Sequence, residues 1–320
     1  MALSLLQEYW AMRLAFNRLC FILAEADSFY HIQARRVMNR LVEGRQTNAP
    51  LLTNKVVDYV TNRQNEDGGY TFCQGAESNK QDTYYGLAIM SLLNASFPNV
   101  EKTIRFLKEP NWDLDNIYSN YYTTKALLLC GEEPNENLKT HISLVANLKR
   151  HSSLADVLPE VSSEFTTIFM TLELAGLLRI QLPKNRTMEW LLRFKNRDGG
   201  FSSEEHSNIN STYYAVASLV LLNVDTEDLR ETVKFVRECE KAYGGFTLIP
   251  ANVTPYMEHT YYGAMTLNLL GENCMFPSQT IDSLLKCQNK NGGFARSDLG
   301  ISTFENTFQA VSVLRKLGFQ

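Results

Sequence analysis

The sequence contains no Cys-x-x-Cys pair, no excess of basic residues and no long apolar run. Its six cysteines are scattered, so they provide no disulfide framework, and we expect free thiols in a reducing compartment. The 31 basic and 35 acidic residues give a net charge of −4, which is not the basic footprint of a nucleic-acid-binding domain. The longest apolar run near the start, Leu19 to Ala24, is too short to span a bilayer. We therefore expect a soluble cytoplasmic protein without an integral membrane segment.

A phosphate-binding loop is also missing, because the Gly-Gly pairs follow helical segments and none continues as Gly-Lys-Ser/Thr. These pairs belong instead to a two-part repeat. The first part is a Gly-Gly-aromatic motif after an apolar helical run, and it occurs at Gly68-Gly-Tyr70, Gly199-Gly-Phe201, Gly244-Gly-Phe246 and Gly292-Gly-Phe294. A repeat of fixed period is typical of stacked helical or strand units.

The second part of the repeat follows about a dozen residues later. It reads Asp82-Thr-Tyr-Tyr, Ser211-Thr-Tyr-Tyr, His259-Thr-Tyr-Tyr and Asn306-Thr-Phe-Gln, with two degenerate copies, Ser119-Asn-Tyr-Tyr and Glu164-Phe-Thr-Thr. The second residues of the six copies stand at positions 83, 120, 165, 212, 260 and 307, so the spacings are 37, 45, 47, 48 and 47. Six units of about 47 residues therefore cover residues 54–320.

Each unit predicts a helical hairpin. The segment before Gly-Gly has helical apolar spacing with charged intervals, and glycine ends it because glycine adopts the positive φ of a helix C-cap without strain. The segment from the second motif onward is apolar nearly all round, as in residues 213–222, and such a helix must be buried on all faces. We expect an all-α fold, an α/α toroid of about six inner and six outer helices. It forms one domain over residues 1–320, with a helical extension at 1–45.

An open helical array is the alternative to closure, but open arrays need polar terminal caps. The last unit ends in Val311-Ser-Val-Leu-Arg-Lys-Leu-Gly-Phe without a capping helix. The sequence therefore favours a closed ring over an open superhelix.

The two motifs together resemble the repeat shared by protein prenyltransferase β subunits and triterpene cyclases. That resemblance covers roughly residues 54–320 and implies an α/α toroid whose central cavity holds isoprenoid chains. It also implies two chemical motifs that this sequence lacks. The zinc ligands of protein prenyltransferases correspond here to Tyr256, Glu258 and Asn306, which do not form a tetrahedral set. The Asp-x-Asp-Asp acid motif of the cyclases is absent, and its nearest match is Asp113-Leu-Asp115-Asn.

We therefore expect no metal and no cofactor, with a zinc site built from Cys73, Glu258 and His259 as the alternative. The resemblance places two positions of each inner helix at the cavity mouth, the opening residue and the one three further on, which share one helix face. The opening residues are Asp82, Ser119, Glu164, Ser211, His259 and Asn306, and the second set is Tyr85, Tyr122, Thr167, Tyr214, Tyr262 and Gln309. Helix capping is the other interpretation of Ser119, Ser211 and Asn306.

Our hypothesis for catalysis is an acid or base among Asp82, Glu164, Glu258 and His259. Substrate binding is assigned to Tyr85, Tyr122, Tyr214, Tyr262, Glu305 and Asn306, since tyrosine rings form an apolar wall whose π faces stabilise a cation. These residues predict an isoprenoid-acting enzyme that binds a polyprenyl-type substrate in its cavity, for example for acid-initiated cyclisation. The alternatives are a non-catalytic toroid that binds lipid or peptide, and a prenyltransferase-like subunit that needs a partner chain. Nucleic acid is not among the expected partners.

Overall fold

The computed structural model describes residues 49–109, 117–133, 164–180 and 184–319. Six helices form an inner ring: α4 (Lys80–Leu92), α6 (Ile117–Leu129), α8 (Glu164–Leu177), α10 (Ile209–Leu221), α12 (Met257–Leu269) and α14 (Phe304–Lys316). Outside them lie α3 (Ala49–Thr61), α5 (Val100–Lys108), α9 (Lys184–Leu192), α11 (Arg230–Cys239) and α13 (Pro277–Lys286), with a 3-10 turn at Thr226–Leu229 before α11. Within the described residues, β-type backbone pairing is limited to isolated β-bridges. The predicted all-α fold is confirmed.

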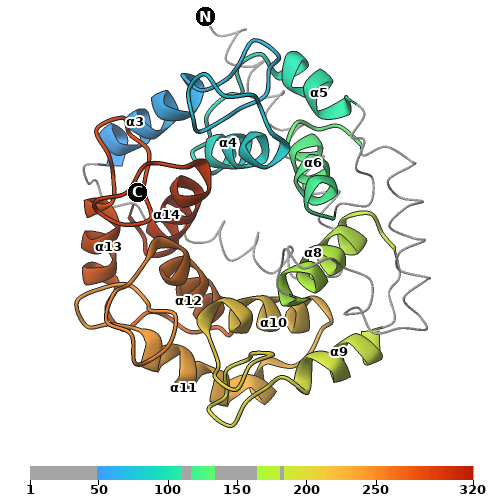
Figure 1. Ribbon diagram of the computed structural model, residues 1–320, viewed down its shortest axis with the longest axis vertical. Coiled ribbons are helices and arrows are strands. Elements are labelled where there is room, and N and C mark those ends of the chain that lie inside the picture. Colours follow the sequence, from blue (N-terminus) through green and yellow to red (C-terminus); the bar gives the residue numbers. More distant parts are fainter. Residues whose placement is uncertain (1–48, 110–116, 134–163, 181–183, 320) are drawn as a thin grey trace, which may run out of the picture. The chain divides into compact units, whose positions relative to one another are not determined.

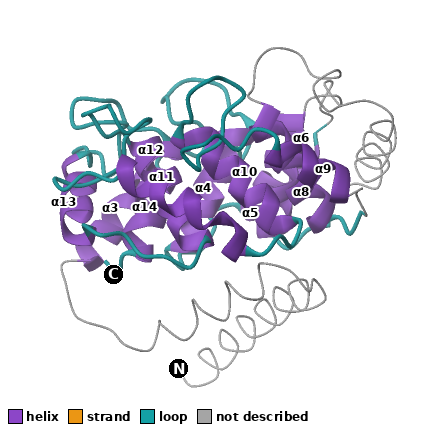
Figure 2. Ribbon diagram, turned by 90° about the horizontal axis from the view of Figure 1, so that it is seen from below, coloured by secondary structure: helices purple, strands orange, loops and turns teal. Residues whose placement is uncertain are grey.

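The inner helices form a closed ring. Each packs against the next in chain order, and α14 packs against α4 (Figure 1). Seen from the side, the helices make one band with loops along both of its edges (Figure 2). The prediction of closure over an open superhelix is thus confirmed, and the two ends of the repeat region meet in one seam.

Glycine makes this packing possible between neighbouring units. The first glycine of each Gly-Gly pair has a positive φ, between 87° and 104°. A Cβ atom there would lie 2.0–2.4 Å from backbone atoms of the outer helix in the next unit. At the seam, Gly292 of the last unit meets the carbonyl of Lys55 in α3 in this way. Only a residue without a side chain fits such a contact.

The aromatic residue after each Gly-Gly is tied to the second motif of its own unit. Tyr70, Phe201, Phe246 and Phe294 are fully buried. Their backbone N–H groups donate to the hydroxyls of Thr83, Thr212, Thr260 and Thr307 at 2.9–3.2 Å. Each buried N–H needs an acceptor, and the threonine supplies it in all four units although the interval between the two residues varies from 11 to 14.

Two expectations about helix ends were wrong. The Gly-Gly pairs are not C-caps, since the outer helices end earlier, at Thr61, Leu192, Cys239 and Lys286. Nor are Ser211 and Asn306 N-caps, because the N-caps of α10 and α14 lie three residues earlier, at Asn208 and Thr303. Those caps accept from the backbone N–H groups of Ser211 and Asn306, so the opening residues lie in the first turn.

Ser119 likewise is the third residue of α6 and not its cap. The helical extension expected at 1–45, the Asp113–Asp115 segment and Cys20 lie outside the described residues. The five cysteines within them are free thiols. A search of the same residues finds no helix with the length and hydropathy that crossing a membrane requires.

Candidate functional site

Aromatic side chains from all six inner helices meet inside the ring. Their contacts run from α4 to α6, α8, α10, α12 and α14 and back to α4, with ring centroids 4.9–6.5 Å apart. We call this set the aromatic girdle: Tyr84, Tyr85, Tyr121, Tyr122, Phe169, Tyr213, Tyr214, Tyr261, Tyr262 and Phe308. Centroid separations in this range are those of favourable aromatic pairs.

The tyrosines of the girdle form two groups. The Glu305-side tyrosines are Tyr85, Tyr122, Tyr214 and Tyr262, whose pKa values are raised by burial, with a smaller rise from the Glu305 charge. Their hydroxyls pair, Tyr214 with Tyr262 at 2.9 Å and Tyr85 with Tyr122 at 3.4 Å. The Lys125-side tyrosines are Tyr84, Tyr121, Tyr213 and Tyr261, which lie toward Lys125 and Glu173. The girdle therefore has two chemically distinct ends.

Glu305 occupies one end, in the first turn of α14. Its Oε1 accepts from the Tyr85 hydroxyl and from Gln309 Nε2, both at 3.4 Å. Burial raises the pKa of Glu305, and the charges of Glu258 and Asp82 raise it further, while the Tyr85 hydrogen bond lowers it. Gln309 is 3% exposed, and its Oε1 has no hydrogen-bond partner among the described residues. This end thus carries a carboxyl group biased toward its protonated form.

Lys125 and Glu173 occupy the other end. Lys125 Nζ lies 2.9 Å from Glu173 Oε1 and 2.9 Å from the Tyr121 hydroxyl, which donates to Glu173 Oε2. The ammonium group also stands 4.8–5.1 Å from the centroids of Tyr121 and Tyr84. Sequence reasoning missed this cluster. The signal was a Lys and a Glu in inner helices whose only other charged residue is Glu164 in the first turn of α8.

Glu258 and His259 lie together at the start of α12. Glu258 Oε1 binds Arg296 at 2.5 Å and 2.7 Å, and His259 Nε2 lies 3.7 Å away from the same oxygen. Arg296 stacks on Tyr256, 4.1 Å from its centroid. Burial lowers the pKa of His259, against the opposing effect of Glu258, so the imidazole is biased toward its neutral form. Its Nδ1 is buried without a partner in the described part of the chain.

The other residues of the site hypothesis have more local roles. Asp82 Oδ2 accepts from the backbone N–H of Phe72 and from Asn79 Nδ2, which ties the preceding loop to α4. Burial raises the pKa of Asp82, and these two hydrogen bonds lower it. Glu164 opens α8 and is partly exposed, as is Asn306 in α14. Of the four proposed acids and bases, only Glu258 and His259 are thus in mutual contact.

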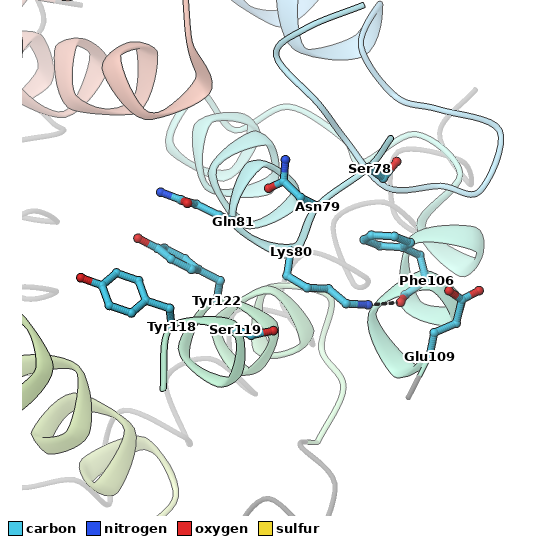
Figure 3. A pocket seen from close by; sticks show the side chains of 9 residues that line it. All are labelled: Ser78, Asn79, Lys80, Gln81, Phe106, Glu109, Tyr118, Ser119 and Tyr122. Atoms are coloured by element: carbon cyan, nitrogen blue, oxygen red, sulfur yellow. Dashed lines mark hydrogen bonds between the residues drawn. The ribbon is translucent and has the colours of Figure 1, made fainter. Parts of the chain in front are cut away.

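A pocket of about 500 Å³ opens beside the girdle between the starts of α4 and α6. Figure 3 shows its lining, which is Ser78, Asn79, Lys80, Gln81, Phe106, Glu109, Tyr118, Ser119 and Tyr122. The Lys80 ammonium donates to the carbonyl of Phe106, and burial lowers its pKa. Tyr122 lines this pocket and is also a member of the girdle.

The residues at the zinc position do not fit a zinc ion. Glu258 is already ion-paired with Arg296, Tyr256 stacks on that arginine, and Asn306 is an amide. Zinc needs converging thiolate, imidazole or carboxylate groups. No group of three such side chains occurs in the part of the chain that the structure describes. The alternative site from Cys73, Glu258 and His259 is therefore not assembled.

Comparison with known proteins agrees with this architecture. The family model of the prenyltransferase alpha-alpha toroid domain matches residues 18–116, 109–246 and 137–319. The chain belongs to the prenyltransferase alpha-alpha toroid domain family. No curated protein matches the sequence.

Two solved structures share the fold at low sequence identity. Protein geranylgeranyltransferase-I from Candida albicans, complexed with GGPP, has a TM-score of 0.65 and 19% identity over 82% of this chain and 90% of that chain. A single-residue variant of the type II terpene cyclase MstE from Scytonema, in complex with the substrate geranylgeranyl dihydroxybenzoate, has a TM-score of 0.57 and 13% identity over 84% of this chain and 97% of that chain. Both similar proteins carry geranylgeranyl compounds.

Proposed function

We propose that this protein is an isoprenoid-acting enzyme that binds a polyprenyl-type chain inside its helical ring. The observation that carries the proposal is the aromatic girdle, to which all six inner helices contribute. An apolar wall of aromatic faces suits a polyene, and it stabilises a carbocation formed from one. The geranylgeranyl compounds of the two similar structures support this class of ligand.

The reaction that fits best is protonation of an alkene, followed by a carbocation step. Such a reaction needs a carboxylic acid that stays protonated beside an apolar chain. Glu305 meets this need, because it hydrogen-bonds Tyr85 in the girdle, and burial raises its pKa. Glu258 is a weaker candidate because it is ion-paired with Arg296, and Asp82 accepts hydrogen bonds from the preceding loop. Glu305, which the sequence assigned to substrate binding, is therefore the proposed proton donor.

Ligand binding is the first test. Purified protein is equilibrated with radiolabelled geranylgeraniol, and binding is measured by equilibrium dialysis. Replacing the hydroxyl-paired rings, in Tyr214→Ala/Tyr262→Ala, should weaken binding by at least about tenfold because two large buried contacts are lost. Tyr243→Ala is the matched control, since Tyr243 is 58% exposed and lies in a turn outside the girdle. Equal binding by both variants would contradict a site in the ring.

Turnover is the second test. The protein is incubated with geranylgeranyl diphosphate and geranylgeranyl dihydroxybenzoate in D₂O, and extracted products are analysed by mass spectrometry. An acid-initiated reaction places one solvent deuterium on carbon, and Glu305→Gln should reduce the rate by about 10²–10⁴-fold. Tight binding without any product would favour the non-catalytic toroid.

A prenyltransferase-like subunit with a partner chain is the second candidate. It is favoured by three large apolar residues on the loops before α12 and α14, Val253, Leu299 and Ile301, which are 75%, 93% and 73% exposed. Apolar residues this exposed often mark an interaction surface. A stoichiometric complex in native mass spectrometry, lost in Leu299→Ser/Ile301→Ser, would support this candidate.

A further inference from the structure

Lys125 and Glu173 are an unusual pair for the inside of a helical ring. Their side chains are 19% and 6% exposed, and both come from inner helices whose other residues are largely apolar. Removing two charges from water is unfavourable, and a hydrophobic pair of similar volume is often at least as stable. Stability alone therefore does not explain why this ion pair is present.

The position of the pair in the ring suggests another role. In the order of packing, α8 lies opposite α14, with two inner helices between them on either side (Figure 1). Glu305 is three residues before Phe308, whereas Glu173 is seven residues after the equivalent Thr166. Ten residues correspond to about 15 Å along a helix axis. The two carboxyl groups thus stand on opposite walls and at different depths, with the girdle between them.

The environments of the two carboxyl groups also differ in charge. Glu305 has no ion-pair partner among the described residues, and its charged neighbours Glu258 and Asp82 are negative. Glu173 receives hydrogen bonds from an ammonium group and from the Tyr121 hydroxyl. Two carboxyl groups in such opposed settings fit the roles of acid and base.

We propose that Glu173, ion-paired with Lys125 and oriented by Tyr121, is the proton acceptor that ends the carbocation reaction. The inference rests on the proposed function. Lys125 and Tyr121 are positioning residues for the carboxylate. The Lys125 ammonium stands over the rings of Tyr84 and Tyr121.

The proposed reaction is balanced. Glu305 transfers its proton to an alkene carbon, whose π electrons form the new C–H bond, and a carbocation and a carboxylate result. The C–H bond next to the cationic carbon later breaks, its electron pair forms a C=C bond, and the proton passes to Glu173. Solvent then returns a proton to Glu305 and removes one from Glu173. The net change is an isomerisation without oxidant or reductant.

The test compares products and not only rates. Wild type, Glu173→Gln and Glu305→Gln are incubated with geranylgeranyl dihydroxybenzoate in D₂O, after circular dichroism has shown that each is folded. Wild type should give an alkene with one deuterium. Glu173→Gln should lose alkene formation by about 10²-fold or more and release instead a deuterated alcohol, because water then captures the cation. Glu305→Gln should give neither product.

Each outcome decides the assignment. An unchanged alkene yield in Glu173→Gln, or loss of deuterium uptake in that variant, would overturn it, because the first step does not involve Glu173. If wild type itself takes up no deuterium, the proposed function fails and this inference fails with it. If Glu173→Gln does not fold, Tyr121→Phe provides the same test, since it keeps the ring, and a shift from alkene toward alcohol is expected there too.

Discussion

The two ends of the aromatic girdle hold the same functional group in different settings. At one end Glu305 accepts hydrogen bonds from a tyrosine hydroxyl and a glutamine amide, and the charges of further acidic residues act on it. At the other end Glu173 accepts hydrogen bonds from an ammonium group and a tyrosine hydroxyl. Cationic neighbours favour the ionised carboxylate, and burial without them favours the protonated form. All six inner helices come from one repeat, yet a few side chains give the two ends of the girdle opposite chemical settings.

The largest effect is expected from removing the cation. Lys125→Met leaves the Glu173 carboxylate buried without its ammonium partner, which should destabilise the protein by about 3–5 kcal/mol. Urea denaturation at pH 7 measures the change. The double variant Lys125→Met/Glu173→Leu is the control and should recover most of the loss. A double variant no more stable than Lys125→Met would mean that packing, and not charge, sets the effect.

A matched pair of tyrosine variants sharpens the comparison. Tyr121→Phe removes a hydrogen bond to an ion-paired carboxylate and should destabilise by about 1.5–3 kcal/mol. Tyr85→Phe removes the 3.4 Å hydrogen bond to Glu305, and its effect should be about 0.5 kcal/mol. The two variants lose the same atom, so equal effects on urea denaturation would contradict the difference between the ends.

The smallest effect concerns the pH dependence of stability. The pKa of Glu305 is raised in the folded protein from the ordinary value of 4.5. Between these two pKa values the folded state binds more protons than the unfolded state, so stability falls as the pH rises. Glu305→Gln does not titrate, and its stability relative to wild type should increase above pH 4.5. A difference that stays constant through this window would argue against a raised pKa.

Most of the fold could be predicted from the sequence because the residues that define the repeat are the ones that make the contacts within and between units. The Gly-Gly pairs reflect the close approach of the next outer helix, as at Gly292 and Lys55. The threonine of the second motif reflects its bond to the aromatic residue, as between Thr83 and Tyr70. Helix ends were less predictable, because Asn208 and Ser211 both suit an N-cap and the backbone decides between them.

The site was harder to predict because its members lie in different units. Lys125 and Glu173 are 48 residues apart, in the two helices that carry the degenerate copies of the motif, and no local pattern joins them. Glu258 and His259 are adjacent in sequence, yet Glu258 forms its ion pair with Arg296 from the next unit. The sequence analysis singled out one tyrosine of each Tyr-Tyr pair and missed the preceding one, which also contacts neighbouring rings, as Tyr84 and Tyr121 do.

The most direct measurement of the difference between the ends is infrared spectroscopy of the protonated carboxyl group. Difference spectra between wild type and Glu305→Gln, and between wild type and Glu173→Gln, are recorded between about pH 4 and 8, a range in which ordinary glutamates ionise. The account predicts a carboxylic acid band that persists above pH 4.5, disappears in Glu305→Gln and remains in Glu173→Gln. A band that survives Glu305→Gln, or that is lost in Glu173→Gln, would contradict the assignment of acid and base to these two ends.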